Sequence, residues 1–537
     1  MSESRVPVLV VGGSLVGLTT AAQLGAHGVR SLVVERHPGT AIHPRAASFH
    51  QRTMEIFRGL GIQQSVQDAA AREFVQNGAI MAVESLAGKE LAYFQTNYNQ
   101  GVEELSPTPR LFLTQIGLEP LLRDRACELG ADVRFNTELV SFSQDADSVR
   151  AVIRDRTDGT ENTVTADYLV AADGAHSMVR RQLGIGLAGR GDFARCITIY
   201  FRSDVRPMIG DRNLSVIYVN HPEFLGFFRF AIDGDAGFLA VFSTLSADGG
   251  RNTDVAADTS TERCTSFVRA ALGAPDDWPI EIDSVQQWDA SASWAEQFRG
   301  GRVLLAGDAA HVMPPTGGFG GNTGVADAHN LAWKLALVLQ GHAGAGLLDS
   351  YDAERRPGSA MVVEQAYVRY VARLDPSLPK ENLAEELDDA AVELGAVCHS
   401  DAVVTDGDPV PGTHNPRTGS ALVGARAPHL WLDRDGERIS TLDLVRGGFV
   451  LLAGPAGDAW CAAAHTVGKE LGLDVAAARI GGEIADPAGI FAQSYGIDAD
   501  GAVLVRPDDV VAWRSVSTAA DPADALRGVL ERILALA

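Results

Sequence analysis

Cysteine is scarce in this chain, and its scarcity limits the chemistry that thiols can supply. Five cysteines occur in 537 residues, far apart, and no two form a C-x-x-C pair. An odd and scattered set suits neither a disulfide framework nor a zinc site. We therefore expect reduced thiols and a cytoplasmic location. The five are Cys127, Cys196, Cys264, Cys398 and Cys461.

Long apolar runs and an excess of basic charge are also missing, and we expect no secretion leader. No stretch approaches the roughly 18 consecutive apolar residues that cross a bilayer. The first residues, MSESRVPVLVVGG, enter an apolar strand and show no secretion signal. The 45 basic side chains are outnumbered by 69 acidic ones, giving a net charge of −24. This charge opposes binding to nucleic acid or to an anionic membrane, so we expect neither partner.

Metal-ligand spacing is a third absence. The histidines, including His27, His37, His43 and His50, form no i, i+4 pair with a carboxylate and no ligand pattern, so no metal is expected. His311 follows Asp308 closely and could suggest a base. We interpret it instead as a structural histidine at a buried corner.

The remaining composition is that of an ordinary globular protein, with 46% hydrophobic and 21% charged residues. The first motif follows an apolar strand at residues 6–11. Gly12 and Gly17 open the next helix, and Ser14 replaces the middle glycine of G-x-G-x-x-G. Glu35 ends the second strand, 18 residues beyond Gly17, where a dinucleotide-binding fold needs an acid for the ribose. This spacing favours dinucleotide binding over glycines that only turn a strand into a helix.

Two later blocks repeat the pattern of a buried strand followed by a polar turn. Residues 168–185 contain Asp173-Gly174 after an apolar strand, and residues 302–341 contain Gly307-Asp308 followed by PPTGGFGGNTG and a long helix. With the first turn, the three blocks make an ordered set.

In this order the blocks resemble those of the class A flavoprotein aromatic monooxygenases, the family of para-hydroxybenzoate hydroxylase and phenol hydroxylase. The resemblance covers roughly residues 5–375. The strings VVGGSLVGL, HPRAASFHQRTMEIFR and GGFGGNTGVADAHNLAWKLA look like those of bacterial aromatic-polyketide hydroxylases that tailor tetracenomycins and anthracyclines. Serine at position 14 is a common variant in that subgroup.

The resemblance implies noncovalent FAD and assigns roles to individual residues. The pyrophosphate would lie at the first turn, the adenosine at Glu35 and Arg36, and the ribityl chain near Gln115 and Asp308. Arg45 and Asp173 would serve both FAD and the nicotinamide cofactor. The implied cofactor-binding residues are Gly12, Ser14, Val16, Gly17, Glu35, Arg36, Arg45, Gln115, Asp173, Asp308, Pro315, Gly318, Gly320, Gly321 and Asn322.

The loop at residues 314–324, called the glycine loop below, is where we expect the chemistry. Its glycines bring backbone close to a flat ring, and the start of the next helix presents N–H groups to negative charge. We expect Pro314, Gly320, Gly321 and Asn322 near the isoalloxazine ring. The loop offers no side-chain nucleophile, and we assign no catalytic side chain.

Strand-like segments between residues 213 and 245 are rich in aromatic residues, which suits a flat substrate. Alternation separates Phe224, Phe228 and Phe230 from Phe227 and Arg229, and the sequence does not tell which set faces the flavin. Our candidate substrate contacts are Tyr218, Phe228 and Arg229. A cross-strand or solvent-facing role is the alternative for each.

These features predict a mixed α/β fold in which a Rossmann-type FAD domain is interleaved with a β-sheet substrate domain. We expect the FAD domain at residues 1–180 and 285–375, and the substrate domain at 181–284 with parts of 75–115. A linker at 376–427 leads to residues 428–537, which resemble the thioredoxin-like C-terminal domain of phenol hydroxylase. Without C-x-x-C, that domain is interpreted as a packing or assembly unit.

The expected reaction is insertion of one oxygen atom from O₂ into a polycyclic aromatic polyketide. The resemblance implies a C4a-hydroperoxyflavin, reduction by NAD(P)H with NADPH favoured, and a monomer or homodimer. Baeyer–Villiger, ring-cleaving or rearranging oxygenation stays open, as does hydroxylation of a simple phenol or an antibiotic. A halogenase is disfavoured because W-x-W-x-I is absent. A flavin dehydrogenase and a non-enzymatic flavin-binding module are the other rivals.

Overall fold

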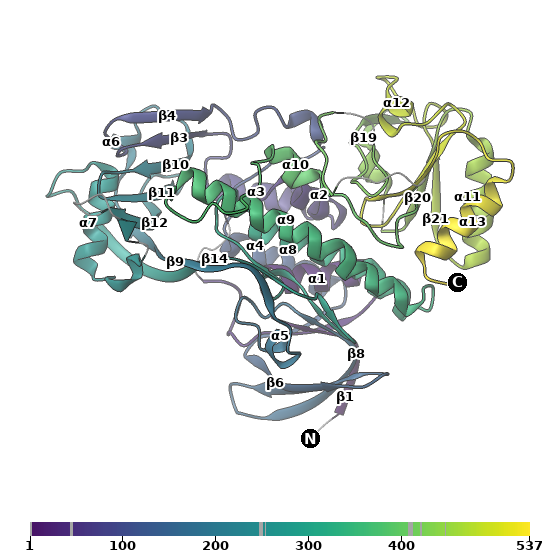
Figure 1. Ribbon diagram of the computed structural model, residues 1–537, viewed down its shortest axis with the longest axis horizontal. Helices are drawn as coiled ribbons and strands as arrows, with labels where there is room; N and C mark the ends of the chain where they lie inside the picture. The colour runs from purple at the N-terminus through teal and green to yellow at the C-terminus, as the bar shows by residue number, and fades with distance from the viewer. Residues whose placement is uncertain are drawn as a thin grey trace.

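The computed structural model describes residues 3–42, 47–245, 251–252, 254–405, 412–418, 421–445 and 447–536. It has three lobes (Figure 1), each built on its own sheet. The N-terminal strands form the lower lobe, the aromatic sheet the upper left lobe, and the C-terminal residues the upper right lobe. The long helix α9 (Asp349–Arg373) crosses the middle of the molecule between them.

The lower lobe contains an eight-stranded sheet. Its main path is β15 (Arg299–Gly300), β16 (Val303–Leu305), β8 (Glu161–Ala171), β1 (Glu3–Val11), β2 (Ser31–Val34) and β5 (Asp132–Arg134), and β6 (Thr137–Gln144) with β7 (Val149–Asp155) extends it from β8. The pairings of β1 with β2 and β8, of β2 with β5, and of β16 with β8 are parallel. A parallel sheet is covered on both faces, and Val8, Leu9 and Val10 are fully buried accordingly.

The helices of this lobe pack into one hydrophobic core with the sheet, and several of them contain the sequence motifs. They are α1 (Leu15–Ala26), α2 (Gln51–Gly59), α3 (Gln63–Glu73), α4 (Gln115–Glu128), α5 (Met178–Gln182) and α8 (Phe319–Leu339). Short 3₁₀ turns lie at η1 (Glu103–Leu105), η2 (Val255–Ala257), η3 (Gly307–Ala309), η4 (Ala345–Leu348) and η5 (Thr441–Leu444). The apolar faces of α1, α4 and α8 belong to one core with the sheet.

The upper left lobe is a nine-stranded sheet. Its order is β17 (His311–Val312), β14 (Glu281–Ala295), β9 (Leu187–Arg202), β12 (Ala236–Leu245), β11 (Phe224–Phe230), β10 (Leu214–Asn220), β3 (Ala79–Val83) and β4 (Glu90–Gln95), with β13 (Arg251–Asn252) beside β12. One face packs on α7 (Thr261–Leu272), and the other faces α9. The short helix α6 (Arg206–Ile209) follows β9. The sheet takes strands from both expected segments, while the exact domain limits stay a prediction.

The C-terminal lobe has a four-stranded sheet of order β21 (Val475–Arg479), β20 (Phe449–Ala453), β22 (Ala502–Val505) and β23 (Val511–Ser515). β20 and β21 are parallel, and β22 and β23 are antiparallel to their neighbours. With α11 (Asp458–Leu471) and α13 (Pro522–Ile533), this is the β-α-β plus β-β-α order of a thioredoxin-like domain. A hairpin of β18 (Trp431–Arg434) and β19 (Glu437–Ser440), and helix α12 (Phe491–Tyr495), complete the lobe.

The segment expected as a surface linker needs a correction. Residues 389–394 form α10 (Asp389–Leu394), and Ala390, Val392 and Leu394 are buried. Val397 bridges to Ala425, and both are buried. Small apolar residues in this stretch let it pack between lobes. The described part of the expected linker is therefore partly buried and does not simply run over the surface.

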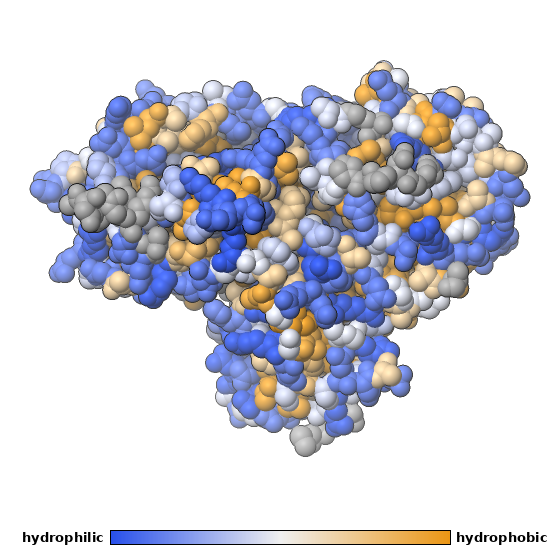
Figure 2. Space-filling view, viewed as in Figure 1, coloured by the Kyte–Doolittle hydropathy of each residue, from blue (hydrophilic) through white to orange (hydrophobic). Residues whose placement is uncertain are grey.

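The surface in Figure 2 is mostly hydrophilic on the face shown, and its apolar residues form separate patches. Among the described residues, no helix is both long and apolar enough to cross a membrane.

Candidate cofactor and substrate site

The turn between β1 and α1 requires glycine on steric grounds. A Cβ on Gly12, whose φ is +105°, would lie 2.2 Å from the carbonyl oxygen of Ala172, and a Cβ on Gly17 would lie 1.8 Å from that of Gly12. The helix therefore begins directly on the strand end, with its first N–H groups facing the turn. Ser14 is exposed at this start, and its hydroxyl makes no capping hydrogen bond. The turn thus offers both the helix N-terminus and a hydroxyl to an anion.

Glu35 lies beside this turn, as its spacing predicts. Its carboxylate accepts hydrogen bonds from the N–H of Gly13 at 2.7 Å and of His37 at 2.8 Å, and the residue is 9% exposed. These two bonds fix the carboxylate at the end of β2. Arg36, the next residue, is exposed.

Gln115 is linked to the same turn by a hydrogen bond to Glu119, a residue that the sequence analysis did not identify. Glu119, one turn later on α4, is fully buried and accepts hydrogen bonds from the N–H of Leu15 at 3.0 Å and of Ala41 at 2.6 Å. The amide of Gln115 donates to it at 3.3 Å. The i, i+4 spacing of these residues in LTQIGLEP was the available signal. Arg45, also expected here, lies outside the described residues.

The block at Asp173 adjoins the block at Gly307-Asp308. One oxygen of Asp173 accepts from the N–H of Met178 at 2.9 Å, and the other is buried and has no hydrogen-bond partner among the described residues. Arg180, from the helix that follows, donates to the carbonyl of Ala309 at 2.9 Å. A buried acceptor without a donor beside two strand ends is compatible with a hydroxyl-bearing ligand.

Asp308 is exposed. It lies next to the first turn because its neighbour Gly307, together with α8, packs tightly on Val16. A Cβ on Gly307 would lie 2.7 Å from Cγ2 of Val16, and one on Gly324 would lie 2.5 Å from it. These contacts bring the first motif, the Gly307-Asp308 block and the start of α8 together at one place.

His311 has the structural role that the sequence indicated. Its Nε2 lies 2.7 Å from Asp327, and both side chains are fully buried. Asp327 also accepts from the N–H of Gly307 at 3.0 Å and from Arg355 at 2.8 Å. Burial alone would raise the pKa of Asp327, but the nearby His311 and Arg355 lower it below its ordinary value. This carboxylate therefore fixes the turn that carries Asp308.

The glycine loop leads into α8 with two left-handed residues. Gly317 has φ +88° and Gly318, the N-cap of α8, has φ +70°, and no side chain caps the helix. No acidic residue lies in the first turn, so the helix start keeps its affinity for negative charge. Gly320 and Gly321 belong to this turn. Pro314 is buried, and Pro315 is exposed.

The side chain of Asn322 is used within the protein. Its oxygen accepts from the N–H of His50 at 2.9 Å and from the hydroxyl of Thr53 at 2.6 Å, while its amide donates to the carbonyls of Ser48 and Gly318. We therefore limit the expected role of Asn322 near the isoalloxazine to its backbone. The side chain joins the glycine loop to the start of α2.

The sheet face that looks toward α9 carries a series of neighbouring aromatic rings. Their centroids are 6.1 Å apart for Phe94 and Tyr218, 6.5 Å for Tyr218 and Phe227, 6.0 Å for Phe227 and Phe242, and 5.9 Å for Phe242 and Trp288. Tyr218 and Phe227 are half-buried. Phe228 points the other way, is fully buried and packs in the core beneath α7. The assignment of Phe228 to the substrate wall is corrected, because strand alternation puts it on the opposite face.

Arg229 shares the face of Phe227 and is buried, and Glu73 acts on its charge from beyond ion-pair distance. It is 6% exposed, forms no ion pair with any described residue, and its Nε has no hydrogen-bond partner there. Its guanidinium lies 4.0 Å from the ring centroid of Phe112 and donates to the carbonyl of Ala47. Burial lowers the pKa of Arg229 from 12.5 to about 10. The contact with Ala47 places this cation beside the segment that Asn322 holds.

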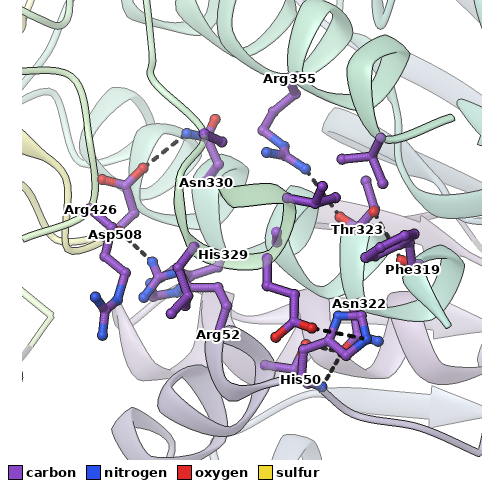
Figure 3. A pocket seen from close by; sticks show the side chains of 18 of the residues that line it. His50, Arg52, Phe319, Asn322, Thr323, His329, Asn330, Arg355, Arg426 and Asp508 are labelled. Carbon is purple, nitrogen blue, oxygen red and sulfur yellow. Dashed lines mark hydrogen bonds and ion pairs between the residues drawn. The ribbon is translucent and has the colours of Figure 1, made fainter. Parts of the chain in front are cut away.

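A separate cavity of about 110 Å³ lies on another side of α8 (Figure 3), between α8, α2, α9 and the C-terminal lobe. Phe319, Asn322 and Thr323 line it from α8, Arg52 from α2, and Asp508 from the C-terminal lobe. It does not include the dinucleotide turn. No group of three or more potential metal ligands occurs among the residues that the structure describes.

Comparisons with known proteins agree with this geometry. A family described as "FAD binding domain" matches residues 5–366, and one described as "Aromatic-ring hydroxylase, C-terminal" matches residues 420–537. The chain belongs to the FAD-dependent aromatic-ring hydroxylases. This is an oxidoreductase family, and the resemblance seen in the motifs is confirmed.

Three relatives illustrate the range of the family. The chain is 50% identical to a 4-methyl-5-nitrocatechol 5-monooxygenase of Burkholderia sp, covering 99% of this chain and 98% of the relative. It is 40% identical to the tetracenomycin A2 monooxygenase-dioxygenase of Streptomyces glaucescens, covering 100% and 98%. A crystal structure of aklavinone-11 hydroxylase with FAD and aklavinone superposes with a TM-score of 0.92 at 40% identity, covering 100% of both chains.

Proposed function

We propose that this hydroxylase inserts one oxygen atom from O₂ into a phenolic aromatic substrate, with FAD as its cofactor and NAD(P)H as the reductant. One observation carries the proposal. The start of α8 and Arg229 both contact the backbone of residues 47–50, through the N–H of His50 and the carbonyl of Ala47, and α8 also packs against Val16 of the dinucleotide turn. A flavin ring at the start of α8 and an aromatic ring at the sheet face can therefore meet there.

The residues at the turn fit the dinucleotide part of FAD. The start of α1 and the hydroxyl of Ser14 would hold the pyrophosphate. Glu35, fixed by two backbone N–H groups, keeps lone pairs for ribose hydroxyls. Asp308 would accept from the ribityl chain, and Asp173 has a buried oxygen that still lacks a donor.

Once reduced by NAD(P)H, the bound FAD would supply the two electrons that activate O₂, so that one atom of O₂ is transferred to the substrate and the other leaves as water. The uncapped start of α8 would stabilise negative charge on the ring edge that faces it. Buried Pro314 would exclude water on the loop side. The protein then has to orient the substrate ring, which the aromatic sheet face can do.

The substrate class that we propose is a polycyclic aromatic polyketide. The neighbouring rings from Phe94 to Trp288 extend over more than one phenol ring; Phe242, which is 1% exposed, packs against Tyr370 of α9 and supports this series from within the core. The tetracenomycin and aklavinone enzymes among the relatives support the same class.

A second candidate is a small nitrocatechol, because the relative at 50% identity is named for that substrate. Both candidates carry a hydroxyl made acidic by an electron-withdrawing group, and either can bind to Arg229 as a phenolate.

The experiment compares a tetracyclic hydroxyquinone with 4-methyl-5-nitrocatechol on the FAD-loaded protein, using NADPH and NADH in turn. We expect substrate-dependent NAD(P)H consumption, matching O₂ uptake and a hydroxylated product for the tetracyclic compound. Turnover of the nitrocatechol alone would overturn the polyketide proposal and leave the monooxygenase proposal intact. Turnover without O₂ uptake would overturn both.

A further inference from the structure

The C-terminal lobe reaches into the FAD-binding part of the chain through one hairpin. The tip between β22 and β23, residues 506–510, lies against the first turn of α2 and the middle of α8. We propose that this hairpin tip positions the glycine loop, acting through Arg52 in the first turn of α2. The inference rests on the proposed function of the glycine loop as the flavin-binding segment.

Arg52 is the direct link to the hairpin tip. Its guanidinium donates to the carboxylate of Asp509 at 2.7 Å and to the carbonyl of Asp508 at 2.7 Å. It also lies 3.1 Å from Glu55 on its own helix. Glu55 in turn accepts from Arg426 at 2.8 Å, the residue that bridges to Val510. The first turn of α2 is thereby held by two arginines and two acids.

Asp509 is placed for this contact at some conformational cost. Its φ of +63° lies in the left-handed region, which is uncommon for an aspartate. Its carboxylate is mostly buried, and Arg52 and His329 keep its pKa at about 2 although burial by itself raises it. The strained residue therefore carries a carboxylate that stays charged against Arg52.

The first turn of α2 is joined to the glycine loop by Asn322. His50, two residues before Arg52, donates its N–H to Asn322, and Thr53, the residue after Arg52, donates its hydroxyl to the same oxygen. The amide of Asn322 then donates at 2.7 Å to the carbonyl of Gly318, the N-cap of α8. The path from Asp509 to Gly318 thus passes through two side chains and one turn of helix.

A second contact ties the hairpin tip to α8 itself. Asp508 accepts from Asn330 at 2.9 Å, as Figure 3 shows. Arg506 binds both Asp508 at 2.6 Å and Glu354 at 2.6 Å, and Glu354 accepts from Lys334 of α8 at 2.8 Å. These charged side chains are nearly or fully buried and pair with opposite charges, so the contact has a defined geometry.

The first turn of α8 is packed on one side and less completely filled on the other. Phe319 packs in an apolar cluster with Val362, Ala366 and Val392. Beside Asn322 and Thr323, a volume of about 110 Å³ is not filled by protein atoms. On that side packing constrains the turn less, so the hydrogen bonds of Asn322 add to the packing of Phe319 in setting where the glycine loop lies.

Helix α2 offers an internal control. Arg58, six residues after Arg52, also pairs with an acid of the C-terminal lobe, donating to Asp443 at 2.6 Å and 2.8 Å. It lies in the last turn of α2, away from His50 and Asn322. Loss of either arginine removes one ion pair between the lobes, and only the loss of Arg52 disturbs the path to the glycine loop.

The experiment compares R52Q with R58Q, and R52K serves as the conservative variant. Hydrogen exchange of the peptide that contains residues 317–323 is measured on the FAD-free proteins. FAD dissociation constants, flavin midpoint potentials and the ratio of hydroxylated product to H₂O₂ are measured on the loaded proteins. Melting temperatures of all variants show whether each is folded.

For R52Q we expect faster exchange across residues 317–323, FAD binding weakened about tenfold, a shifted midpoint potential and more H₂O₂ per product. R58Q should match the wild type within twofold in every readout, and R52K should recover part of the loss. Equal effects of R52Q and R58Q would overturn the inference, as would unchanged exchange and FAD affinity in a folded R52Q. Failure of the wild type to bind FAD would instead overturn the proposed function.

Discussion

Replacing Arg229 by methionine tests the substrate side of the site. Methionine keeps apolar contact with Phe112 but removes the guanidinium. Burial lowers the pKa of Arg229 from 12.5 to about 10, which corresponds to a cost of about 3 kcal/mol for keeping the charge buried. Methionine removes this cost, but it also removes the cation–π contact with Phe112 and the hydrogen bond to Ala47, which together stabilise the fold by about 2–3 kcal/mol. We therefore expect little net change in stability.

Substrate binding should respond very differently. Removing one partner of a desolvated charge pair costs about 3 kcal/mol, or roughly a hundredfold in affinity. We expect R229M to melt within about 3 °C of the wild type, since about 1 kcal/mol shifts a large domain by 2–4 °C. Its dissociation constant for the phenolic substrate, measured by flavin difference spectra, should rise about a hundredfold. R229K should retain most of the binding.

A matched control is available on the other face of the same sheet. Arg263 lies 4.1 Å from the ring of Phe267 on α7, so R263M removes a similar cation–π contact away from the proposed substrate. It should leave the dissociation constant unchanged. A folded R229M that binds the substrate within threefold of the wild type would refute the assignment, and so would an equal effect of R263M.

Three further predictions concern the cofactor turn and the pH range. G17A should fail to bind FAD or to fold, because its Cβ would lie 1.8 Å from the carbonyl oxygen of Gly12; retained FAD in purified G17A would contradict the fit. E35Q should weaken FAD binding about tenfold in fluorescence titrations while E35D recovers part of it; unchanged affinity in E35Q would remove the ribose role. Burial lowers the pKa values of His27 and His429 from 6.5 to about 4. Between pH 6.5 and pH 4 these histidines therefore take up protons in the unfolded chain but not in the folded one, and the free energy of unfolding falls by about 3 kcal/mol per histidine. Melting temperatures should fall over this range, and the fall should be smaller in H429Q; an equal fall would refute the assignment.

The features that the sequence predicted are those that local spacing encodes. Gly12, Gly17 and Glu35 lie at one strand end and the start of the next helix, so their proximity follows from the strand-turn-helix unit alone. The proximity of Asp173 and Asp308 is predictable in the same way, since each follows a strand of the parallel sheet and parallel strands end at one edge of the sheet.

The errors and omissions have a different origin. Phe228 was assigned to the wrong face, because alternation separates two faces without telling which one meets α7. Glu119 was missed because a buried acid on a helix acquires its role only from the backbone of another segment. The contact of Arg52 with Asp509 joins positions 457 residues apart, and no local pattern encodes such a pair. The packing of residues 389–394 between lobes depends on tertiary contacts in the same way.

The central claim is that a flavin bound at the start of α8 delivers oxygen from O₂ to a phenolic ring at the sheet face. The most direct measurement is a single turnover of photoreduced, FAD-loaded protein mixed with the tetracyclic hydroxyquinone and ¹⁸O₂, followed by mass spectrometry of the product. This design removes the dependence on NAD(P)H. The account predicts one ¹⁸O atom per product molecule, whereas an unlabelled product, or one labelled only from H₂¹⁸O, would contradict it.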